Sequence, residues 1–207
     1  MRAIREKRVA RGLLFLLAVV LSTLAPIQAF AHRASSDGPI VGVAIPAIAH
    51  GEMSVVARYR KQVLDLAARQ AVTDPVFRKL SGFVSLQYFA CFWGLVPGSV
   101  SDENSPFNEC SHGYLAGVLS LLTHMTGMPG NQMPARELEA RLNAEIASDP
   151  AHGTLCSNSS ETFDSAVVIG PDWQLASAHW PTVLTFVAAL AAIGLLFVGG
   201  RRLLRLV

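Results

Sequence analysis

A short segment near the middle of the chain combines residue types that bind metal ions. Glu109 and His112 are three positions apart, so on a helix they would lie on one face. Cys110 could add a thiolate ligand if it stays reduced. Helical di-iron proteins use two Glu-x-x-His motifs and two further glutamates, whereas this chain has one such motif. The segment allows copper or iron as an alternative, but the simpler interpretation has no cofactor, with Glu109 favoured by the helix dipole and His112 partly exposed.

A second metal site would arise at a processed N-terminus. Cleavage after Ala31 would leave His32 as the first residue, so its amine and imidazole could together bind copper. Cleavage after Ala29 would place His32 third in the chain. Its imidazole, the terminal amine and two amide nitrogens would then form a square-planar site that suits Cu(II).

The three cysteines predict one disulfide bond and one free thiol, because an exported domain folds in an oxidising compartment. Cys91 lies near the end of one predicted helix and Cys110 near the start of the next. Antiparallel packing of these helices would bring both sulfur atoms beside the connecting loop. A bond between them would contribute ~3 kcal/mol by the chain-entropy model. The alternative pairing of Cys110 with Cys156 stays open, because connectivity cannot be read from a sequence.

Motifs of the common catalytic sites are missing from the chain. It contains no Gly-x-Ser-x-Gly, no His-Glu-x-x-His and no phosphate-binding glycine loop. Cys110 and His112 are two positions apart and would point away from each other on a helix, so they do not form a nucleophile–base pair. The sequence therefore favours a protein without enzymatic activity and assigns no catalytic residue.

Two apolar stretches set the expected topology. Residues 1–31 are typical of a cleaved signal peptide, with five basic residues before a predominantly apolar stretch of thirteen residues, which is too short to span a bilayer. Residues 181–200 carry no charge and would form a transmembrane helix ~30 Å long. Three arginines follow in the tail 201–207, which the positive-inside rule places in the cytoplasm. We expect a single-pass protein of a bacterial inner membrane, with most of its chain in the periplasm.

The part of the chain between these stretches is acidic. Residues 32–180 contain nine lysines and arginines against fourteen aspartates and glutamates. Binding to nucleic acid needs clustered positive charge, so the composition excludes this class of partner.

Apolar residues recur at helical spacing in four segments of the exported part. Asp74 and Pro75 mark the start of the second helix, as an N-cap residue and a first-turn proline. This second helix is the most apolar, so we expect it to be the central one. The predicted helices cover about 52–72, 75–94, 105–125 and 135–147.

The expected fold class is all-α, a small helical bundle with one C-terminal transmembrane helix. The bundle would occupy residues 51–149, after an irregular lead-in at 32–50 and before a loop or stalk at 150–180. One short strand is expected within the stalk, at 166–169, where apolar and β-branched residues gather.

Aromatic residues near the end of the second helix favour an interaction role. Tyr88, Phe92 and Trp93 add bulky side chains to a domain whose single core has limited volume. They could dock a membrane-protein partner or a second copy of the chain. A membrane-anchored accessory protein is therefore the leading interpretation, and a metal- or cofactor-binding protein is the alternative.

Overall fold

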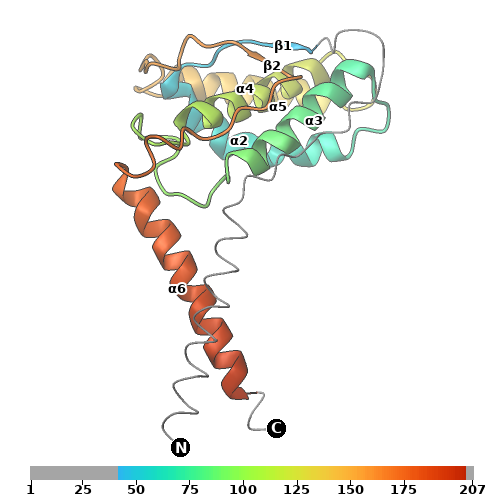
Figure 1. The fold of residues 1–207 in the computed structure, drawn as a ribbon. Coiled ribbons are helices and arrows are strands. Elements are labelled where there is room, and N and C mark those ends of the chain that lie inside the picture. Colours follow the sequence, from blue (N-terminus) through green and yellow to red (C-terminus); the bar gives the residue numbers. More distant parts are fainter. Residues whose placement is uncertain (1–41, 204–207) are drawn as a thin grey trace, which may run out of the picture. The chain divides into compact units, whose positions relative to one another are not determined.

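The structure, a computed structural model, describes residues 42–203 (Figure 1). Helices dominate this part of the chain, as predicted, and two very short strands accompany them. The expected signal peptide at 1–31 and the candidate ligand His32 lie outside the described residues. The elements are β1 (Ala44–Ile45), α2 (His50–Ala68), α3 (Pro75–Ala90), α4 (Asn108–Met125), α5 (Gln132–Ser148), β2 (Phe163–Asp164) and α6 (Trp180–Leu203).

Helix α4 occupies the centre of the domain. It packs against α2, α3 and α5, and most of its side chains are buried. Gly117 allows this close packing, because a Cβ atom there would lie 2.8 Å from the ring of Phe83 on α3. The prediction that the second helix is central was wrong. That helix, α3, leaves Leu86 and Phe89 exposed, so its high apolar content does not correspond to complete burial.

Helix α3 begins as predicted and ends earlier. The Asp74 carboxylate accepts a hydrogen bond from the Phe77 amide at 2.7 Å, which caps the helix N-terminus. The helix was expected to run to residue 94, but it ends at Ala90. Phe92 and Gly94 adopt positive φ angles of 47° and 79°, a conformation that the right-handed helix does not contain.

Part of the segment that follows α5 pairs with the start of the domain. Strands β1 and β2 pair antiparallel, with Ala44 opposite Asp164 and Ile45 opposite Phe163. The strand expected at 166–169 instead lies a few residues earlier, at β2. Phe163 is buried in the core, so this pairing fastens the late segment to the start of the domain.

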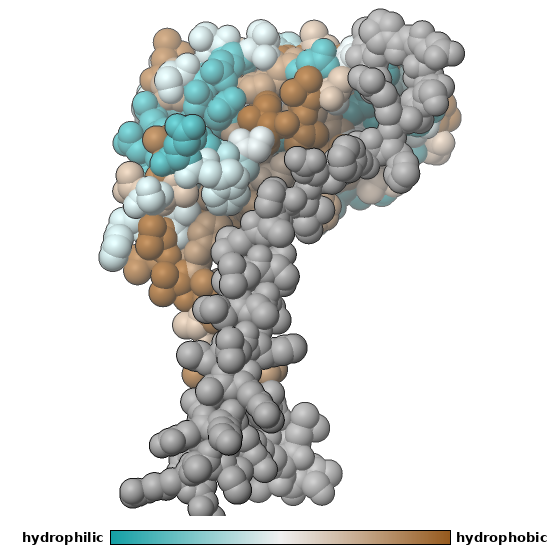
Figure 2. Space-filling model, viewed as in Figure 1, coloured by the Kyte–Doolittle hydropathy of each residue, from teal (hydrophilic) through white to brown (hydrophobic). Residues whose placement is uncertain are grey.

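The C-terminal helix α6 is long and apolar. Within the described part of the chain, Trp180–Phe197 is the one helical stretch long and apolar enough to cross a membrane. Figure 2 shows hydrophobic residues along the start of this helix. The predicted apolar helix at 181–200 is thus confirmed as a helix.

Candidate metal centre

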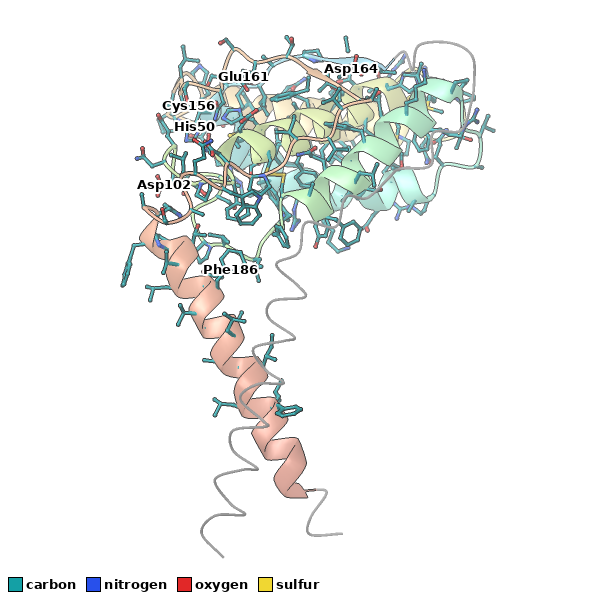
Figure 3. All side chains as sticks on the ribbon, in the orientation of Figure 1. His50, Asp102, Cys156, Glu161, Asp164 and Phe186 are labelled. Carbon is teal, nitrogen blue, oxygen red and sulfur yellow. A yellow bond between two sulfur atoms is a disulfide. The ribbon has the colours of Figure 1, made fainter. Side chains whose placement is uncertain are left out.

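His112 lies beside two further side chains that can bind a metal. His50 is the first residue of α2, His112 lies in the second turn of α4, and Cys156 lies in the loop between α5 and β2. One ligand atom from each side chain lies within 4.8 Å of the other two. His112 Nε2 and Cys156 Sγ lie 3.1 Å apart. Figure 3 shows His50 and Cys156 together at one end of the domain.

A glycine brings two of these elements together. A Cβ atom on Gly51 would lie 1.6 Å from the carbonyl oxygen of Ala151, so only glycine fits here without moving the backbone. The Gly51 amide donates a hydrogen bond of 3.0 Å to the carbonyl oxygen of Thr154. The first turn of α2, which carries His50, therefore packs directly against the loop that carries Cys156.

The hydroxyl of Ser159 orients two of the three candidate ligands. Its oxygen accepts hydrogen bonds from the backbone amides of His50 at 3.0 Å and Cys156 at 2.9 Å. The same hydroxyl donates to Cys156 Sγ at 3.4 Å. One serine side chain can fill all three roles, since it has two acceptor lone pairs and one proton. A hydrogen bond of this kind stabilises a thiolate and fixes its direction, as the outer partners of metal ligands do.

An asparagine at the start of α4 also lies near the sulfur atom. The Asn108 Oδ1 atom accepts a hydrogen bond from Asn158 Nδ2 at 3.0 Å and lies 3.9 Å from Cys156 Sγ. The loop around the cysteine is therefore held to the start of α4 by polar contacts, as well as to α2.

Burial keeps the His112 imidazole neutral. The side chain is completely buried, and desolvation together with the neighbouring His50 lowers the pKa of His112 to about 4. Neutral imidazole is the form that binds metal ions. The Nδ1 atom of His50 is also buried and has no hydrogen-bond partner, so this imidazole nitrogen is free to bind a metal ion.

The other ligands expected from the sequence lie apart from this group. Cys110 and Cys91 lie at disulfide-bonding distance, with their Cα atoms 5.6 Å apart, and Cys156 is the free cysteine. Glu109 lines a cavity together with Glu161, and none of the three candidate ligands lines that cavity. Burial, followed by the charges of Glu161 and Asp172, raises the pKa of Glu109. The structure thus groups His112 with His50 and Cys156 rather than with Glu109 and Cys110.

Sequence reasoning did not connect His50 and Cys156 with His112. These residues come from three separate segments, and no spacing rule joins positions so far apart in the chain. Only the packing of α2, α4 and the late loop brings them together. The one available signal was the odd number of cysteines, because the single expected disulfide leaves one thiol without a partner.

The aromatic residues expected to interact with a partner lie near the end of α3. Tyr88 and Phe92 are partly exposed, whereas Trp93 packs on the buried Tyr114 with ring centroids 4.6 Å apart. The guanidinium of Arg60 covers the Trp93 ring at 5.4 Å from its centroid. Trp93 is therefore engaged within the domain, while Tyr88 and Phe92 keep part of their surfaces exposed.

No known protein family, curated protein or solved structure matches this chain.

Proposed function

We propose that this protein binds one zinc or copper ion through His50, His112 and Cys156. The observation that carries the proposal is the convergence of two imidazoles and one thiol from three separate elements, with ligand atoms within 4.8 Å of one another. Nitrogen and sulfur donors of this kind suit zinc and copper. Three protein ligands leave a fourth position for water or a substrate, as in catalytic rather than structural zinc sites.

The same residues could form a catalytic thiol, and the electrostatics disfavour it. The distance of 3.1 Å between Cys156 Sγ and His112 Nε2 fits a nucleophile and its base. An activated thiolate needs a histidine that accepts and holds the proton near neutral pH. The pKa of His112, lowered to about 4, opposes that protonation, whereas it favours a metal ligand. The metal site is therefore the better proposal, and the absence of enzymatic activity stays a prediction.

The proposal includes the topology expected from the sequence. Helix α6 would anchor a small helical bundle, α2 to α5, at the outer face of a bacterial inner membrane. Support comes from the apolar length of α6 and from Arg201, Arg202 and Arg205 after it, which favour a cytoplasmic C-terminus. The Cys91–Cys110 pair agrees with an oxidising compartment such as the periplasm.

An accessory role through the exposed aromatic residues is a second candidate function. The observation that favours it is the exposure of Phe89, of whose surface 74% is accessible, beside the partly exposed Tyr88 and Phe92. Large apolar side chains gathered on a surface are typical of contact with a partner or a membrane. This candidate is independent of the metal site, since the two use different residues.

The metal content of the full-length protein tests the first proposal. We expect about one equivalent of zinc or copper per chain when the protein is purified from its own membrane without chelators. The variants His50→Gln, His112→Gln and Cys156→Ser should each lose most of this metal, because two ligands hold an ion much less tightly than three. Mass spectrometry of the metal, with circular dichroism to verify helix content, makes the measurement.

His152 provides a matched control. It lies in the same loop as Cys156, is exposed, and its Nδ1 atom bonds to the backbone oxygen of Asp149. The variant His152→Gln should keep the metal. Equal metal in the wild-type protein and all three ligand variants would contradict the proposal.

A further inference from the structure

We propose that an apolar surface beside the start of α6 rests on the lipid bilayer. This membrane-facing surface consists of Leu86, Phe89, Phe92, Leu95 and Trp173. The inference rests on the proposed anchoring by α6 and names the partner of the exposed aromatic residues.

The residues of the membrane-facing surface are large, apolar and exposed. Leu86 and Phe89 lie in the last two turns of α3, and Phe92 and Leu95 lie in the turns after it. Each of the four has at least 44% of its surface accessible. A soluble domain rarely leaves so many neighbouring apolar side chains in water, because each exposed Å² of apolar area costs ~25 cal/mol.

Aromatic contacts connect this surface to the apolar helix. The ring of Phe92 meets the ring of Trp173 edge-on, with centroids 6.2 Å apart. Trp173 in turn contacts Phe186 of α6, with centroids 6.3 Å apart. Phe186 lies six residues after Trp180, which is ~9 Å along a helix axis. Trp173 therefore packs against a side chain from the second turn of the apolar helix.

Polar contacts hold the loop before α4 to the first turn of α6. His179 Nε2 lies 3.0 Å from Asp102 Oδ2, and His179 Nδ1 lies 2.7 Å from Thr182 Oγ1. His179 is buried, and its hydrogen bond is the largest cause that lowers the pKa of Asp102. Figure 3 shows Asp102 beside the beginning of α6 and Phe186 further along it. The loop that carries Phe92 and Leu95 is thus fixed next to the helix.

The bilayer is the occupant that this geometry favours over a protein. Lipid that surrounds α6 near Phe186 must also contact the side chain that packs on Phe186, which is Trp173. Trp173 and Trp180 lie where tryptophans gather in membrane proteins, at the boundary between hydrocarbon and water. A second copy of the chain or another protein would have to displace this lipid. Contact with the bilayer needs no additional partner.

Site-directed spin labelling of the full-length chain in lipid nanodiscs tests this inference. The nitroxide is attached at Phe89→Cys in a Cys156→Ser background, with Cys91 and Cys110 left oxidised. A label at Leu190→Cys, on an exposed side chain in the middle of α6, reports whether the helix is inserted. A label at Met133→Cys is the matched control, because Met133 is as exposed as Phe89 and lies on α5.

We expect the label at residue 89 to be more accessible to oxygen and less accessible to a water-soluble nickel complex than the label at 133. If the labels at residues 89 and 133 have the same accessibilities while the label at residue 190 lies in lipid, the surface faces water and the inference is wrong. If the label at residue 190 also has the accessibilities of the label at residue 133, α6 is not inserted, and both the anchoring proposal and the inference fail. Spin–spin broadening at residue 89 that disappears on dilution with unlabelled protein would show that a second copy covers the surface, which also overturns the inference.

Discussion

His112 shows most clearly how one residue depends on its surroundings. The sequence singled it out through the Glu-x-x-His spacing, which is a local pattern. Its neighbours in the structure are His50 and Cys156, and none of the three is close to another in sequence. The chemistry of the residue could be predicted, because imidazole is a ligand in many settings. Its ligand partners could not, because they depend on how three elements pack.

The burial of His112 predicts a pH dependence of stability in the metal-free protein. The ordinary histidine pKa of 6.5 applies to the unfolded chain, whereas burial lowers the pKa to about 4 in the folded one. Between these pH values the unfolded state binds more protons, so the free energy of unfolding falls as the pH drops from 6.5 to 4. The loss in the free energy of unfolding is therefore absent above pH 6.5 and reaches ~3 kcal/mol near pH 4.

Urea unfolding of chelator-treated protein checks this expectation. The wild-type protein should lose ~3 kcal/mol more than His112→Gln when the pH is lowered from about 7 to about 4, since the variant lacks the group that titrates. Other groups, such as Asp74, contribute equally to both proteins. A difference between the two proteins that stays constant with pH would contradict the burial of a neutral imidazole.

At the scale of elements, local patterns predicted where helices form and missed how they pack. The four expected helices correspond to α2 to α5, because apolar spacing and caps such as Asp74 act within one or two turns. The end of α3 was predicted four residues too late, because the left-handed Phe92 has no signal in a hydrophobic pattern. The second helix was wrongly expected to be the central one, because apolar content does not distinguish a buried side chain from an exposed one such as Phe89.

The contact between α2 and the late loop makes a second prediction. Ala in place of Gly51 would force apart the first turn of α2 and the backbone at Ala151, and His50 would move with it. We expect Gly51→Ala to weaken metal binding by about tenfold or more, the scale on which the surroundings of metal ligands act. Competition with a chromogenic chelator measures this affinity.

Gly153 offers the matched substitution in the same loop. A Cβ atom there would meet nothing within 4 Å, so Gly153→Ala should keep the wild-type affinity. Equal affinities in Gly51→Ala and Gly153→Ala would show that the approach of α2 to the loop does not position the ligands.

At the scale of the whole molecule, the proposed metal site and the proposed membrane contact involve different elements. The candidate ligands come from the start of α2, from α4 and from the late loop. The membrane-facing surface comes from the end of α3 and from the residues around the start of α6. The apolar helix was predictable because twenty uncharged residues are a strong signal, whereas the surface beside it required the fold.

X-ray absorption spectroscopy of the metal-loaded full-length protein tests the central claim most directly. For zinc, the proposal predicts one sulfur ligand at about 2.3 Å and imidazole nitrogens at about 2.0 Å. The sulfur contribution should disappear in Cys156→Ser, and the imidazole contribution should decrease in His112→Gln. A spectrum with only oxygen and nitrogen ligands, the same in the wild-type protein and in Cys156→Ser, would contradict the proposed site.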